Sequence, residues 1–141
     1  MLLAAVLASA LLVHSTASQG CMTLTGIKNV KFLINKAQED APSKCSCSAN
    51  VTDCLCLPIP SDNCTAPCFQ EGLWRMTNTT VASPRILILN QVKKTVEALK
   101  NNKCQYFSCE EPCSQATAGN TLTFLKSLLE NLQKERMRGR V

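Results

Sequence analysis

The chain has 141 residues, with 15 Lys or Arg against 10 Asp or Glu and a formal charge of +5 at neutral pH. Its one histidine, His14, lies in a segment that we predict is removed, which would exclude Ser-His-Asp and Cys-His catalysis and histidine metal sites from the mature chain. The length fits one domain with a modest core. We expect a protein that is not an enzyme, holds no metal or cofactor and binds no nucleic acid.

Residues 1–18 are predicted to form a secretory signal peptide. Leu2 to Val13 make a short apolar core, and small residues follow it before the expected cleavage after Ser18. A membrane anchor is the alternative, but about 12 apolar residues are fewer than the roughly 20 that span a bilayer. The prediction is therefore a secreted, extracellular protein without stable membrane insertion, whose mature domain covers residues 19–141.

Apolar residues at helical spacing predict four helices, and no strand pattern of any length is found. The first helix is expected over Leu24–Asp40, with Ile27, Val30, Leu33, Ile34 and Ala37 inward. The second is expected over Thr65–Asn78, with Cys68, Phe69, Leu73 and Met76 inward. The third is expected over Pro84–Lys100, with Ile88, Leu89, Val92, Val96 and Leu99 inward. The fourth is expected over Thr117–Met137, with Leu122, Leu125, Leu129 and Leu132 inward and Phe124 and Leu128 on one edge.

Two aromatic residues fall outside these apolar stripes. Phe32 is either a contact residue for a partner or is covered by the long loop that follows the first helix. Trp74 is either an edge packing residue or a binding anchor. Lys93 and Lys94 belong to a solvated outer face, which could also steer a receptor.

Ten cysteines follow the predicted cleavage point, which allows five disulfides in an oxidising compartment. They are Cys21, Cys45, Cys47, Cys54, Cys56, Cys64, Cys68, Cys104, Cys109 and Cys113. Asn-X-Thr sequons at Asn50, Asn63 and Asn78 agree with secretion and are the expected glycosylation sites. A metal cluster is disfavoured, because Cys45-Ser46-Cys47 and Cys54-Leu55-Cys56 place their thiols closer in sequence than zinc sites usually do.

Connection lengths predict the topology. A short link makes the second and third helices antiparallel, whereas long links before the second and fourth helices can cross the bundle. The expected fold is all-α, an up-up-down-down four-helix bundle with two long disulfide-stapled loops. Disulfides should stay within neighbourhoods: Cys21, Cys64, Cys68 and Cys104 at one end, Cys45, Cys47 and Cys113 at the other, and Cys54, Cys56 and Cys109 along the crossing loops. A short helical turn is expected around Val51 to Cys56.

Specific sequence and cysteine patterns occur at Phe32–Lys36, Lys44–Thr52, Ile59–Thr65, Lys100–Cys104, Tyr106–Glu110, Thr123–Glu130 and in the signal segment. Together they resemble the interleukin-9 family over nearly the whole chain. The chain departs from that family in Leu73–Val92 and at Ser114–Ala116, where the family carries another sequon. The resemblance implies a short-chain four-helix cytokine and growth factor, secreted by activated lymphocytes, that brings together the interleukin-9 receptor alpha chain and the common gamma chain. Janus kinases would then signal in T cells, mast cells and other haematopoietic cells.

In this family the alpha receptor usually meets the first and third helices, and the gamma chain meets the first and fourth. On that basis we assign Phe32, Lys36, Lys93, Lys94 and Glu97 to an alpha-receptor face. We assign Lys28, Lys31, Lys126, Glu130 and Gln133 to a gamma-chain face. We expect a monomer that acts by binding alone. The alternative is a secreted disulfide-rich carrier or inhibitor, which would need an apolar cavity or an exposed rigid loop.

Overall fold

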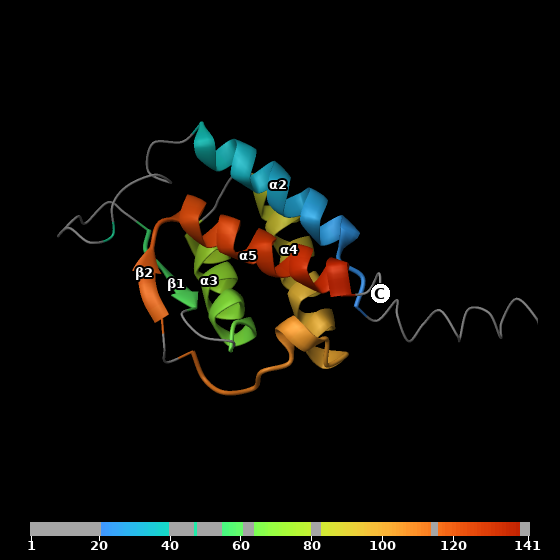
Figure 1. Cartoon of the computed structure of the whole chain (residues 1–141). Coiled ribbons are helices and arrows are strands. Elements are labelled where there is room, and N and C mark those ends of the chain that lie inside the picture. Colours follow the sequence, from blue (N-terminus) through green and yellow to red (C-terminus); the bar gives the residue numbers. More distant parts are fainter. Residues whose placement is uncertain are drawn as a thin grey trace, which may run out of the picture.

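Helices dominate the computed structural model, which describes residues 21–39, 47, 55–60, 64–79, 83–113 and 116–138. The α-helices of these ranges are α2 (Leu24–Gln38), α3 (Ala66–Thr79), α4 (Ser83–Asn101) and α5 (Thr121–Arg138). Figure 1 shows the four packed around one another, so the predicted all-α four-helix bundle is confirmed. The predictions on the signal peptide, the sequons at Asn50 and Asn63, and Cys45 and Cys54 lie outside the described residues.

The helices pack with α2 against α4 and α5, and with α3 against α4. The Cys21–Cys104 disulfide, with Cα atoms 5.6 Å apart, joins the start of α2 to the end of α4. The start of α3 is held at the same end, because the Thr65 hydroxyl donates to the Tyr106 carbonyl just after α4. α2 and α3 therefore begin at one end of the bundle, as the up-up-down-down topology requires. None of the helices in the described ranges has the length and hydropathy of a membrane-spanning segment.

The core is formed by the apolar stripes that face one another across the bundle. All the inward residues predicted for α2 and α3 are buried, as are four of the five predicted for α4; Ile88 is half-buried. In α5 the stripe is rotated from the predicted one. Phe124 and Leu128, expected at its edge, are fully buried, while Leu122 and Leu129 are only half-buried. The cause is the aromatic centre of the core, where the Phe69 and Phe124 rings meet edge to face with centroids 5.8 Å apart.

A two-stranded antiparallel sheet links the two long connections, so the prediction of no strand was wrong. β1 (Leu57–Pro60) pairs with β2 (Ala116–Gly119), with Leu57 opposite Gly119. β1 carries two prolines, which donate no ladder hydrogen bond and therefore occur in edge strands such as this one. A Cβ atom on Gly119 would lie 2.5 Å from Cγ1 of Ile59, so the strands approach closely only because that residue is glycine.

The last helix begins at Thr121 and not at the predicted Thr117, which lies in β2. Asn120 explains the later start. Its Oδ1 atom accepts a hydrogen bond of 2.8 Å from the backbone N–H of Thr123, which is a standard N-cap for a helix. The Gly119-Asn120 pair was therefore the sequence signal for the boundary.

The disulfides confirm one part of the predicted grouping and overturn another. Cys21 pairs with Cys104 at the predicted end. Cys64 pairs with Cys109 and Cys68 pairs with Cys113, so the placement of Cys113 at the opposite end was wrong and the pairs do not stay within the predicted neighbourhoods. The reason is that the chain after α4 first forms the 3-10 turn η2 (Gln105–Phe107) and stays beside the start of α3, where Thr65 donates to Tyr106, before it pairs with β1 as β2. Cys47, expected at the opposite end of the bundle, pairs with Cys56, which was expected along a crossing loop.

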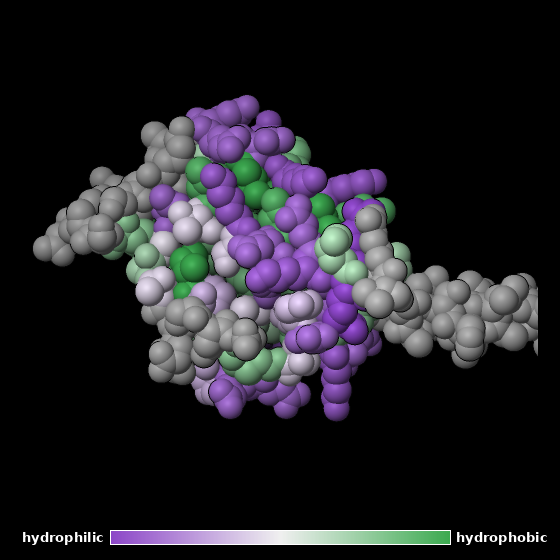
Figure 2. All heavy atoms as spheres, in the orientation of Figure 1, coloured by the Kyte–Doolittle hydropathy of each residue, from purple (hydrophilic) through white to green (hydrophobic). Residues whose placement is uncertain are grey.

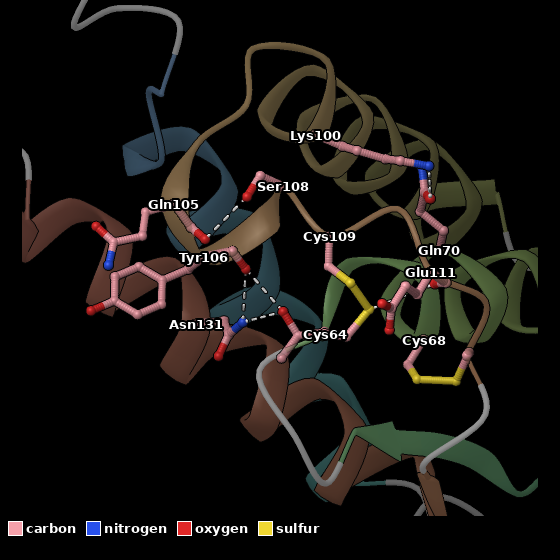
Figure 3. The surroundings of a disulfide bond; sticks show 12 residues. Cys64, Cys68, Gln70, Lys100, Gln105, Tyr106, Ser108, Cys109, Glu111 and Asn131 are labelled. Atoms are coloured by element: carbon pink, nitrogen blue, oxygen red, sulfur yellow. Dashed lines mark hydrogen bonds between the residues drawn. A yellow bond between two sulfur atoms is a disulfide. The ribbon is translucent and has the colours of Figure 1, made fainter.

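A group of hydrogen-bonded polar residues, which we call the polar end cluster, closes this end of the bundle: buried Thr65, Asn131 and Glu135, the backbone of Tyr106, and the exposed Arg138. Asn131 Nδ2 donates to Thr65 Oγ1 at 2.6 Å and to the Tyr106 carbonyl at 3.2 Å (Figure 3). Glu135, whose side chain is fully buried, accepts from the Tyr106 N–H at 2.9 Å and from Arg138 Nε at 2.8 Å. The cluster therefore fixes the turn after α4 onto both α3 and α5 through satisfied hydrogen bonds.

Candidate interaction surfaces

Contacts across the seam between α2 and α4 show which residues of the two helices lie side by side. Asn29 Nδ2 donates to Gln91 Oε1 at 3.2 Å across the seam. One turn earlier in α2, a Cβ atom on Gly26 would lie 2.9 Å from the Thr95 methyl group. Because the helices are antiparallel, residues one turn after Asn29 lie beside residues one turn before Gln91.

Phe32 lies at the outer border of this seam. Its ring is half-buried and packs against the core. Lys36, one turn later, places its Nζ atom 5.6 Å from the ring centroid, within the range of a cation–π contact. The bundle core covers part of the ring, and the long loop predicted as the alternative cover lies mostly outside the described residues, so a contact role for Phe32 stays a prediction.

Leu87 is a surface residue that the sequence analysis missed. It is 63% exposed, although it lies within an apolar helix segment. It precedes Gln91 by one turn and therefore lies on the edge of α4 that borders α2, near Phe32. The signal that could have found it is the one used for Phe32: both residues fall off the inward stripe of their helix.

The lysines assigned to the alpha-receptor face separate onto two edges of α4. Lys94 is exposed on the outward side of α4, next to Leu87, seven residues earlier, and so adjoins the edge that borders α2. Lys93 lies seven residues before Lys100, whose Nζ atom donates to Gln70 of α3 at 3.4 Å. Lys93 and the exposed Glu97 one turn after it therefore lie on the opposite edge, beside α3. We define the α2–α4 face as Phe32, Lys36, Leu87 and Lys94.

The residues assigned to the gamma-chain face lie on the outer sides of α2 and α5. Lys31 is exposed on the edge of α2 that borders α5, and Asn29 lies on the opposite edge. Lys28 is exposed at the centre of the outer side of α2. Lys126 and Gln133 are exposed on the outer side of α5, away from its buried stripe. We define the α2–α5 face as Lys28, Lys31, Lys126, Glu130 and Gln133; Figure 2 shows how hydrophilic the outer sides of these two helices are.

A shallow groove adjoins the α2–α5 face near the end of α5. Its volume is about 430 Å³, and it is lined by Tyr106, Glu130, Gln133, Lys134, Met137 and Arg138. Figure 3 shows that the Tyr106 side chain extends from η2 alongside α5. Met137 is 64% exposed. Glu130 pairs with Lys134 at 3.4 Å, but both are exposed and such a pair adds little stability.

α2 and α4 both carry an excess of basic residues. α2 carries Lys28, Lys31 and Lys36 and no acidic residue. α4 carries four basic residues and one acidic residue, Glu97. In α5, by contrast, the acids Glu130 and Glu135 each pair with a basic residue of the same helix. The positive charge of α2 and α4 favours association with an acidic partner surface.

Cys64, Cys109 and Glu111 bring sulfur and carboxylate atoms within 4.8 Å of one another, as metal ligands would. The two sulfur atoms are joined in a disulfide (Figure 3) and are not thiolates, so they are not available as ligands. Chemistry at this group is therefore disfavoured, and the outer helix faces remain the candidate functional sites.

Comparisons with known proteins agree on one family. A family model described as Interleukin-9 matches residues 1–128. The chain is 70% identical to Interleukin-9 of Homo sapiens over 139 residues, which cover 99% of this chain and 96% of the human protein. It is 53% identical to Interleukin-9 of Mus musculus over 137 residues, covering 97% of this chain and 95% of the mouse protein.

Proposed function

The chain belongs to the interleukin-9 family of cytokines, and from that premise we propose that it is a secreted cytokine that brings together two receptor chains. The first is an alpha receptor of the interleukin-9 type and the second is the common gamma chain. Janus kinases bound to the two receptors would then act on each other's chains in T cells, mast cells and other haematopoietic cells. The chemistry is binding alone, and we expect the cytokine to act as a monomer.

The observation that carries this proposal is the arrangement of α2, which presents a separate edge to each of two neighbouring helices. One edge contributes Phe32 and Lys36 to the α2–α4 face. The other contributes Lys31 to the α2–α5 face. Two receptors can therefore contact one rigid helix bundle on different sides, which fixes the distance between them.

We propose that the alpha receptor binds the α2–α4 face. The face combines two apolar side chains with two basic ones, which is the composition of a binding centre with steering charges around it. Lys93 and Glu97, which sequence reasoning also assigned to the alpha receptor, lie on the α3 edge of α4 and so offer an internal comparison.

The test is binding of the oxidised, refolded protein to immobilised alpha-receptor ectodomain, followed by gamma-chain ectodomain with and without the first receptor. We expect the gamma chain to bind better when the alpha receptor is present. Lys94→Glu should weaken alpha-receptor binding, whereas Lys93→Glu, the same charge reversal one residue earlier, should leave it unchanged. Lys126→Ala should affect only the gamma-chain step.

Equal losses from Lys93→Glu and Lys94→Glu would show that overall charge, and not the α2–α4 face, controls binding. Failure of both receptors to bind a folded protein without free thiols would reject the two-receptor proposal. The carrier or inhibitor alternative would then be tested by extracting bound lipid from the purified protein.

A further inference from the structure

Trp74 is a large aromatic side chain that neither proposed receptor face uses. It is the only tryptophan of the chain, and it is 58% exposed on α3. Its neighbours one turn earlier are engaged elsewhere: Gln70 accepts from Lys100, and Glu71 pairs with Arg75 at 2.9 Å. Within the described part of the chain, the ring and cation–π contacts involve phenylalanines and not Trp74. A group that packed on the exposed indole would shield this apolar surface from water.

Asn78 follows Trp74 by four residues, about one helical turn, and lies on the same side of α3. Its side chain is exposed, and it opens the sequon Asn78-Thr79-Thr80. Side chains on an α-helix lean toward the helix N-terminus, so a group attached to Asn78 covers the turn that precedes it. That turn carries Trp74.

We propose that the N-linked glycan of Asn78 packs its first sugar residues on the exposed indole of Trp74. The glycan is attached when the Asn78 amide nitrogen bonds to C1 of the first sugar of a lipid-diphosphate-linked oligosaccharide, loses a proton and displaces the lipid diphosphate. One face of an N-acetylglucosamine ring presents C–H groups. These complement the negative face of an aromatic ring, and the contact shields apolar surface from water.

This assignment rests on the secretion included in the proposed function, because N-glycans are added in the secretory pathway. It goes beyond that function in giving Trp74 a partner within the same molecule. A receptor contact at Trp74 is disfavoured by its position, since it lies on α3 whereas both proposed faces use α2. A glycan one turn away would also obstruct a protein partner there.

The experiment uses the full chain secreted from cells that leave glycans at the high-mannose stage. Mass spectrometry of glycopeptides measures occupancy at Asn78. Because Trp74 is the only tryptophan, fluorescence reports on it alone. Compared with the glycosylated protein, Thr80→Ala should emit at longer wavelength and show acrylamide quenching about twofold higher, since the sugar shields roughly half of the exposed indole. Endoglycosidase H, which leaves one sugar on Asn78, should preserve most of the shielding.

The matched control is Asn63→Gln, which removes another sequon and should not change the fluorescence. A double-mutant cycle measured by melting temperature gives a second test. Loss of the Asn78 glycan should lower the melting temperature of the parent protein but not that of Trp74→Ala. Unchanged quenching on loss of an occupied Asn78 glycan would overturn the proposal, as would an empty Asn78 when other sequons are occupied. Absence of glycan from every sequon would overturn it as well, whereas failure of the protein to appear in the medium would contradict the secretion on which the proposed function rests.

Discussion

The polar end cluster and the seam between α2 and α4 each contain an asparagine that bridges two segments, yet the two asparagines have opposite roles. Asn131 is 8% exposed and donates to two acceptors, at 2.6 and 3.2 Å. Asn29 lies at the surface and donates to Gln91 at 3.2 Å. A buried polar group costs free energy when its partner is lost, whereas an exposed one turns to water. The end of the bundle therefore holds the fold, and the helix faces remain free for recognition.

Removal of the end disulfide should have the largest effect on stability. Cys21→Ala with Cys104→Ala opens a crosslink between residues separated by 83 positions. The chain-entropy relation gives a loss of about 4.5 kcal/mol in the free energy of unfolding, against about 2.6 kcal/mol for a loop the size of Cys47–Cys56. Denaturant unfolding of both double variants measures the difference. A larger loss for Cys47–Cys56 would show that the stapled end does not dominate stability.

Loss of Glu135 should be the next largest effect. Glu135→Ala leaves the Tyr106 N–H without its acceptor and opens a cavity at a fully buried position, so we expect a loss of about 3 kcal/mol. Glu135→Gln keeps an oxygen acceptor and the side-chain volume, and it should lose markedly less. Thermal and denaturant unfolding compare the two variants. Similar losses for both would mean that the ionic pair with Arg138, and not the hydrogen bond to the turn, is what matters.

Two glycines sharpen the contrast between core and seam. A Cβ atom at Gly72 would lie 2.3 Å from the Phe124 ring, which is packed on all sides, whereas one at Gly26 meets the Thr95 methyl at 2.9 Å. We expect Gly72→Ala to cost about 2 kcal/mol and Gly26→Ala less than about 1 kcal/mol, because helix propensity partly offsets the milder contact. Melting temperatures check the order. An equal effect at both positions would mean that the seam is as rigid as the core.

Sequence periodicity predicts the helices well because each helix buries one continuous stripe. The inward residues of α2 were all identified, and its start was correct. Residues that act across long sequence distances were not found. Asn131 and Glu135 lie among the polar residues of α5, and only the return of the turn after α4 makes their burial favourable. The β1 prolines hid a strand that exists because β2 pairs with it.

The surface was predicted in part. Phe32 and Lys36 were identified from their place on the helix wheel, and the structure brings them together. Lys93 and Lys94 are neighbours in sequence but lie on different sides of α4, and which side borders α3 cannot be known before the partner of each α4 edge is fixed. Leu87 was missed because a run of apolar residues around it offered several alternatives for the core.

Leu87 gives the sharpest test of the difference between fold and face. It is 63% exposed, so Leu87→Ala should leave the free energy of unfolding almost unchanged. Burial of a leucine side chain in an interface is worth about 2 kcal/mol, so the same variant should weaken alpha-receptor binding about 10- to 30-fold. Met137 is 64% exposed but lies by the groove on α5, so Met137→Ala should not alter alpha-receptor binding. Surface plasmon resonance on the immobilised receptor measures both. Unchanged binding of Leu87→Ala would place the receptor contact elsewhere on α4. Equal losses in both variants would indicate nonspecific hydrophobic capture and would contradict binding through the α2–α4 face.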